Sequence, residues 1–83
     1  MMKILVNVSV PAIGENYDIL VPDSLRIRSA TALIAEAVEN LSDHKYVSSG
    51  TECLCSADKN ILLRENGTLE RYGIKNGDHL VLM

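Results

Sequence analysis

The chain has 83 residues and a net charge of −3, with 47% apolar residues but three Tyr, no Phe and no Trp. That length fits one domain, residues 1–83, whose core must be built from aliphatic side chains. The longest basic cluster is the pair Arg26 and Arg28, which argues against nucleic-acid binding and against anionic membranes. No segment approaches the ~20 apolar residues of a membrane-spanning helix, and no signal peptide is recognisable. We therefore expect a cytoplasmic protein without direct membrane insertion.

Apolar residues alternate with polar ones from Ile4 to Val10, and again from Tyr17 to Val21. This period of two, rich in β-branched residues, predicts two half-buried strands. Residues 11–16 between them contain Pro and Gly, so the two strands form an antiparallel hairpin. The second strand should lie at a sheet edge with no lysine to guard it. Pairing with another chain, including a homodimer, stays open.

The spacing of apolar residues changes to three and four residues between Ile27 and Leu41, which predicts an amphipathic helix of about four turns. Its start lies between Ser24 and Ser29. Asp23 and Ser24 are the candidate N-caps. Residues 40–50 are polar and rich in serine, and we expect a connecting loop there.

The C-terminal half predicts several short elements separated by turns. They are strands at 52–56, 61–63 and 79–83, a short helical turn at 69–72, and turns at 57–60, 66–67 and 76–78. A helix that follows a hairpin and precedes further strands packs across one face of the sheet. The sequence therefore predicts an α+β fold with one helix on a mixed sheet of four to five strands.

The spacing of apolar residues near the C-terminus resembles the end of ubiquitin and its relatives. The matching run is Leu63-x5-Leu69-x2-Tyr72-Gly73-Ile74-x-Asn76-Gly77-Asp78-x-Leu80-x-Leu82. With a turn at Asp58-Lys59, the chain is most similar to the YukD/EsaB family, small bacterial ubiquitin-like proteins associated with type VII (ESX/WXG) secretion. The resemblance implies a ubiquitin-like β-grasp fold and a non-catalytic accessory subunit. Its contacts would be a membrane component or the ATPase of the secretion machine.

Ubiquitin-type modifiers and sulfur carriers need a flexible Gly-Gly tail, because their C-terminal carboxylate must enter a narrow adenylating site. This sequence ends at Met83 within the last predicted strand. Conjugation and sulfur transfer are therefore not expected. Two alternatives stay open: a modifier or sulfur carrier whose tail is absent from this sequence, and an interaction module of another pathway.

The residues with catalytic or metal-binding chemistry are few. Cys53 and Cys55 are too close in sequence for an unstrained disulfide. A zinc site would require His44 and His79 to join them, which nothing in the sequence indicates. Nucleophilic attack by either cysteine would need a nearby base oriented by a third group, and two histidines whose positions the sequence does not fix do not provide one. We expect no enzyme activity, no catalytic residue, no metal and no cofactor.

The alternation in the last strand separates two faces. Leu80 and Leu82 point to the core, so Val81 and Met83 point to the opposite face, which the helix does not cover. Leu5 and either Leu54 or Cys55 would join them, depending on strand register. We therefore hypothesise a protein-binding patch on the helix-free face. Its residues are Leu5, Cys55, Val81 and Met83.

Overall fold

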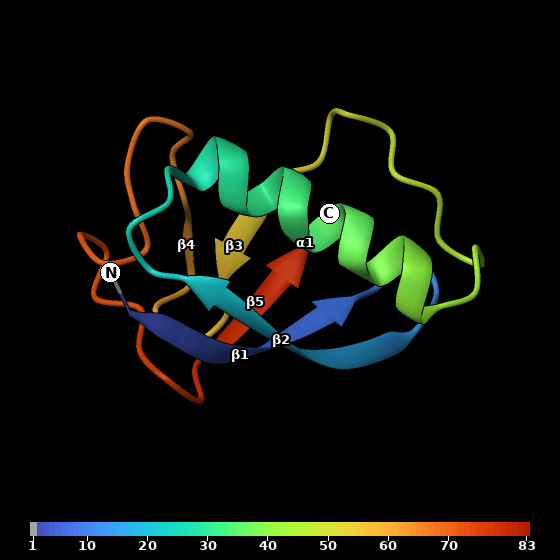
Figure 1. Cartoon of the computed structure of the whole chain (residues 1–83), viewed down its shortest axis with the longest axis horizontal. Coiled ribbons are helices and arrows are strands. Elements are labelled where there is room, and N and C mark those ends of the chain that lie inside the picture. The colour runs from blue at the N-terminus through green and yellow to red at the C-terminus, as the bar shows by residue number, and fades with distance from the viewer. Residues whose placement is uncertain (1) are drawn as a thin grey trace.

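In the computed structural model, which describes residues 2–83, one helix lies across one face of a five-stranded sheet (Figure 1). The elements are β1 (Lys3–Val10), β2 (Glu15–Pro22), α1 (Ile27–Leu41), β3 (Leu54–Ser56), β4 (Ile61–Leu62) and β5 (His79–Leu82). The strand order in the sheet is β2-β1-β5-β3-β4. Strands β1 and β5 run parallel, and the other neighbours are antiparallel. The predicted ubiquitin-like β-grasp is confirmed, and so is the position of β2 at an edge.

The hairpin of β1 and β2 is the most regular part of the molecule. Its register runs without interruption from the pair Lys3 and Pro22 to the pair Val10 and Glu15. β2 is longer than the predicted Tyr17–Val21, because its pairing with β1 continues to Glu15 at one end and to Pro22 at the other. Pro22 is tolerated because a strand end at a sheet edge does not require its missing N–H.

Helix α1 begins at Ile27, within the predicted window, and ends at Leu41 as predicted. Its first N–H groups are bonded by a loop distant in sequence. The N–H of Ile27 donates to the carbonyl of Gly67 at 2.8 Å, and the N–H of Arg28 to that of Glu65 at 3.1 Å. No side chain caps the helix, so the predicted caps Asp23 and Ser24 are wrong. The carbonyls of the loop replace the cap that a helix N-terminus otherwise needs.

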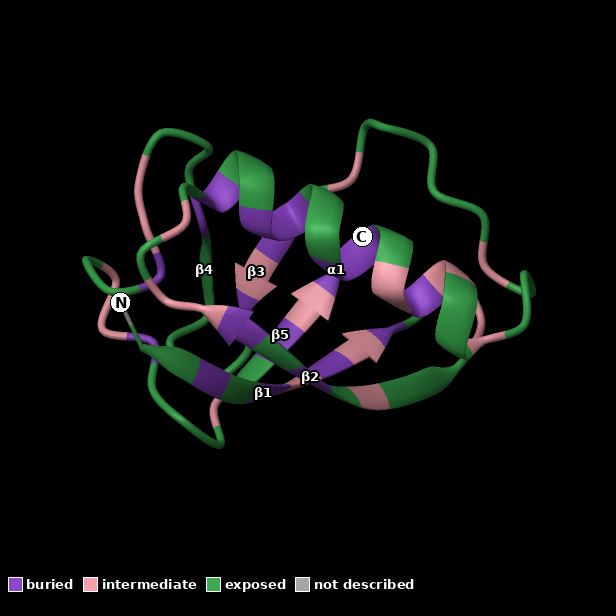
Figure 2. Ribbon diagram, viewed as in Figure 1, coloured by how far each residue is buried: buried purple, intermediate pink, exposed green. Residues whose placement is uncertain are grey.

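The core lies between α1 and the inner face of the sheet and is aliphatic, as the composition predicts (Figure 2). It includes side chains from the helix, from all strands except β4, and from the turns between β4 and β5. The largest that are completely buried are Ile27, Ile34, Leu54, Leu69, Leu80 and Leu82. Since α1 covers only this inner face, the opposite face of the sheet is left open.

The C-terminal half contains shorter elements than expected. β3 begins at Leu54 and not at residue 52, β4 ends at Leu62, and β5 ends at Leu82. Residues 69–72 form hydrogen-bonded turns, in which the N–H of Tyr72 donates to the carbonyl of Thr68 at 3.2 Å, the four-residue step of a single helical turn. Short apolar runs fix the presence of an element here, but tertiary contacts set its ends.

Candidate protein-interaction surface

The open face of the sheet carries a row of apolar side chains across its three shortest strands. Cys55 in β3 is the register partner of Val81 in β5 and of Leu62 in β4. Directly opposite residues in antiparallel strands project to the same face. Leu54 is buried, so the register places Cys55, and not Leu54, on the open face.

Met83 continues this row beyond the end of β5. Its backbone exchanges two hydrogen bonds with Cys53, at 2.8 and 2.9 Å, while its side chain is 62% exposed. A shallow hollow of about 330 Å³ opens between these strands, lined by Cys55, Ile61, Leu62, Val81 and Met83 with Ser56, Ala57 and Asn60 at its border. We call Cys55, Leu62, Val81 and Met83 the open-face patch. Ile61 is the register partner of the buried Ser56, so it borders the hollow from the other face of β4.

Ile61 and Leu62 were not predicted as site residues, although both are exposed, Leu62 at 58%. The sequence carried a signal for them. Adjacent residues of a strand point to opposite faces, so two consecutive apolar residues in a short strand cannot both enter the core. With Cys55 outward, its partner Leu62 must also be outward.

Leu5 lies away from the open-face patch. It is the register partner of Leu20, and the two form a separate exposed pair on β1 and β2. The residue of β1 beside Val81 is Ser9, which is four residues, or about 13 Å, further along the strand than Leu5. The polar pair Asn7 and Asp18 lies between, joined by a hydrogen bond of 3.1 Å. The structure thus brings together Cys55, Val81 and Met83, but not Leu5.

A histidine and an aspartate lie together at the start of β5. Asp58 accepts a hydrogen bond of 2.9 Å from the backbone N–H of His79, and its other oxygen lies 3.3 Å from Nδ1 of the same residue. The backbone bond is the main reason that the pKa of Asp58 is lowered. This pair fixes the turn before β5, because it satisfies a backbone donor.

The cysteines and histidines do not assemble into a reactive or metal-binding group. His44 lies 3.6 Å from Glu39, and His79 lies beside Asp58. Burial, followed by the neighbouring Cys53, raises the pKa of the Cys55 thiol, which disfavours the thiolate needed for nucleophilic attack. Among residues 2–83 there is no group of three His, Cys, Asp or Glu side chains that could hold a metal ion.

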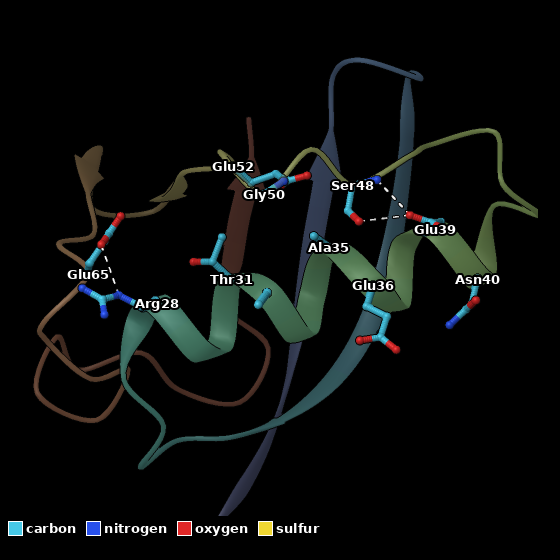
Figure 3. Close-up of a pocket in the computed structure, with 11 residues that line it drawn as sticks. Arg28, Thr31, Ala35, Glu36, Glu39, Asn40, Ser48, Gly50, Glu52 and Glu65 are labelled. Atoms are coloured by element: carbon cyan, nitrogen blue, oxygen red, sulfur yellow. Dashed lines mark hydrogen bonds and ion pairs between the residues drawn. The ribbon is translucent and has the colours of Figure 1, made fainter.

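A larger groove of about 560 Å³ lies on the helix side, between α1 and residues 48–52 (Figure 3). Its carboxylates hold the loop. Glu39 accepts bonds of 2.9 and 3.1 Å from the backbone N–H and the hydroxyl of Ser48. Glu52 accepts from the N–H groups of Ser49 and Gly50 and from the Tyr46 hydroxyl, at 2.7, 3.0 and 2.8 Å.

These hydrogen bonds also determine the charge state of the groove. The backbone bond from Ser48 is the main cause of the lowered pKa of Glu39. Burial alone would raise the pKa of Glu52, but the bonds from Ser49 and Tyr46 outweigh it and the pKa is lowered. Both carboxylates are therefore ionised acceptors committed to the loop, an arrangement that shapes the chain and does not resemble an acid–base pair.

No helix within residues 2–83 is long and apolar enough to cross a membrane. The fold and its exposed apolar surface can be compared with known proteins. One family model matches residues 5–82, that of the protein YukD of the WXG100 protein secretion system (Wss). A search of curated protein sequences finds no match.

Solved structures of ubiquitin-like domains superpose on the whole chain. A domain of an Arabidopsis thaliana protein has a TM-score of 0.74 and 22% identity, covering 100% of this chain and 78% of that chain. The domain of Plasmodium falciparum Dsk2 has a TM-score of 0.70 and 20% identity, covering 99% and 100%. The ubiquitin-like domain of EccD5 from Mycobacterium xenopi has a TM-score of 0.72 and 16% identity, covering 100% and 94%. These likenesses establish the fold.

Proposed function

Because the chain belongs to the YukD family of the WXG100 protein secretion system, we propose that it is a non-catalytic binding subunit of that system, acting through the open-face patch. The family supplies the association with secretion. The exposed apolar surface supports binding as the mode of action.

The observation that carries the proposal is the clustering of apolar side chains where the fold does not need them. Leu62 and Met83 are 58% and 62% exposed, and they flank the same hollow together with Val81 and Cys55. Fully burying one such side chain in an interface is worth roughly 1.5–3 kcal/mol. Met is also unbranched and adapts its shape to a partner surface. These properties suit a docking site for an apolar side chain of another protein.

The partner that fits this surface is a protein component of the secretion machine, either its membrane component or its ATPase. A cytoplasmic location follows from that role, because an ATPase works where ATP is present. Leu5, also predicted for the site, would take part only if the partner extends across the polar row of Asn7 and Asp18 to the pair of Leu5 and Leu20. The open-face patch alone defines the minimal contact.

The test is capture of the secretion ATPase or membrane component from cell extract, identified by mass spectrometry. The double variant Val81→Asp and Met83→Asp places two charges in the open-face patch and should abolish capture while leaving the melting temperature unchanged. Val47→Asp is the matched control, since Val47 is 69% exposed in the loop after α1. It should bind normally. Capture by the double variant at the wild-type level would rule out the open-face patch as the binding site.

A further inference from the structure

The backbone of β2 presents unused hydrogen-bonding groups at the outer edge of the sheet. In an antiparallel ladder, every second residue pair exchanges both backbone bonds, and the pairs in between point theirs away from each other. The backbone N–H and C=O groups of Leu5 and Asn7 point away from β2. The N–H of Leu5 donates to Oδ1 of Asn76 at 2.7 Å, and that of Asn7 to the carbonyl of Asp78 at 2.9 Å. The backbone N–H and C=O groups of their partners, Leu20 and Asp18, must therefore point to the outer edge of the sheet.

Asn16 lies two residues before Asp18, so its backbone groups point the same way. Three alternate residues of β2 therefore expose both an N–H and a C=O at the sheet edge. β2 is the terminal strand of the sheet, and no other group in residues 2–83 bonds to these N–H groups. Proteins commonly protect such edges with lysine, proline, a bulge or a short strand. β2 has eight residues, no lysine, and proline only at its last position. The opposite edge, β4, has two residues.

On the helix side, this edge is bordered by apolar side chains. Leu33 and Leu41 are 41% and 58% exposed, and with Ala37 they recur at four-residue steps along one flank of α1. The other flank, with Ala35 and Glu39, lines the groove beside residues 48–52. Leu33 and Leu41 therefore lie on the β2 side, where α1 contacts β2. A strand added to β2 would place every second side chain against them.

On the open face, the same edge carries one carboxylate, that of Asp18, and β2 contains no basic residue. Glu15 is the register partner of the buried Val10, so its side chain lies on the helix side of the sheet. Asp18 is hydrogen-bonded to a neutral partner, the amide of Asn7 at 3.1 Å, so its charge is not compensated there. Glu15 has Lys45 at 3.8 Å, a pair in which both side chains are largely exposed. On the open face, the side chains of an added strand would therefore be favoured by a positive charge beside Asp18.

A second copy of the chain fits this edge poorly. The antiparallel self-pairing that uses Asn16, Asp18 and Leu20 of both copies would place the two Asp18 carboxylates directly opposite each other, with no basic residue in either strand. Like charges across a strand pair are destabilising. We propose that the outer edge of β2 binds an extended segment of a partner protein by strand addition, and that this segment alternates basic and apolar residues.

The site is independent of the open-face patch, which lies on the other side of β1, and the full-length chain can be tested without knowing the partner. The probe is an acetylated and amidated heptapeptide of alternating lysine and valine, added to the isotope-labelled protein. Amide hydrogen exchange is followed by nuclear magnetic resonance. In the free protein, the amides of Asn16, Asp18 and Leu20 should exchange fast and those of Tyr17, Ile19 and Val21 slowly. The peptide should slow the three fast amides roughly tenfold.

Two variants of one position separate backbone pairing from side-chain contact. Leu20→Pro removes an outward N–H that β1 does not use, while Leu20→Ala keeps the N–H and shortens the side chain. The proline variant should weaken peptide binding roughly tenfold, and the alanine variant about threefold or less. Should proline lower the melting temperature, Asp18→Asn replaces it. That variant should weaken binding of the lysine–valine peptide and reduce the dependence of this binding on salt.

Three outcomes would overturn the proposal. The first is no protection of the three outward amides by the lysine–valine peptide. The second is equal protection by a glutamate–valine peptide, which would remove the charge argument. The third is protection of the same amides that rises with protein concentration alone, which would show that a second copy occupies the edge. The double variant Val81→Asp and Met83→Asp should bind the peptide normally, so loss of the open-face patch leaves this test intact.

Discussion

The sheet has two lateral halves, a hairpin side with β1 and β2 and a short-strand side with β3, β4 and β5, and the two sides achieve strand pairing by different means. The hairpin of β1 and β2 is a continuous ladder whose register never breaks. On the other side, β3, β4 and β5 have three, two and four residues, and their ends are held by side chains that bond to the backbone. Asn76 binds the N–H of Leu5, Asp58 that of His79, and Tyr72 that of Arg64, at 2.7, 2.9 and 2.9 Å.

This difference shows where individual polar residues matter. A long ladder distributes its hydrogen bonds over many backbone groups, so no single side chain on its open face is critical. Short strands leave backbone donors beyond their ends, and each must find a partner. The side of the sheet that carries the open-face patch therefore depends on specific Asn, Asp and Tyr residues. On the side that carries the free edge, the ladder between β1 and β2 needs no side chain, and Asn76 is required only where β1 extends past the start of β5.

The largest expected effect is at Leu80, the β5 residue that joins the two sides. It is completely buried and lies beside Val8 of β1 and Ser56 of β3. Leu80→Ala should lower the free energy of unfolding by about 2–5 kcal/mol, because it leaves a cavity in the core. Val81→Ala, one residue further on the open face, should cost no more than about 0.5 kcal/mol. Urea denaturation measures both; equal losses would mean that the open face is also packed.

A smaller effect separates the polar residues of the two sides. Asn76→Ala removes the acceptor of the Leu5 N–H and should cost about 1 kcal/mol. Asn7→Ala removes only a side-chain contact to Asp18 on the hairpin and should cost no more than about 0.5 kcal/mol. The two variants are matched in residue type and are compared by thermal and urea unfolding. If Asn7→Ala proves as costly as Asn76→Ala, the hairpin is not held by its ladder alone.

The same contrast explains what the sequence could predict. Alternation in β1 and the three- and four-residue spacing of α1 are properties of neighbouring residues, so both elements were found with nearly correct bounds. The faces of Val81 and Met83 followed from alternation in the same way. The capping of α1 did not, because its first N–H groups donate to the carbonyls of Gly67 and Glu65, some forty residues away in the chain. No local pattern encodes such a contact.

The composition of the open-face patch was predicted only in part for a related reason. Cys55 and Leu62 are neighbours through the register of β3 with β4, and Leu5 is remote because β1 and β5 are parallel and staggered. Register between strands far apart in sequence is set by core packing and turn geometry. Alternation gives the face of each residue but not its neighbours on that face.

The smallest expected effect concerns the side-chain bonds of the short-strand side in acid. The pKa of Asp58 is lowered in the folded protein, chiefly by the bond from the backbone N–H of His79. A lowered folded-state pKa gives stability that is complete above the unfolded value, about 4, and is lost as the pH falls through the folded value. Wild type should therefore melt slightly above Asp58→Asn at neutral pH, and the difference should shrink and then disappear as the pH falls through the folded-state value. A difference in melting temperature that stays constant through this range would show that the carboxylate charge contributes nothing to the turn before β5.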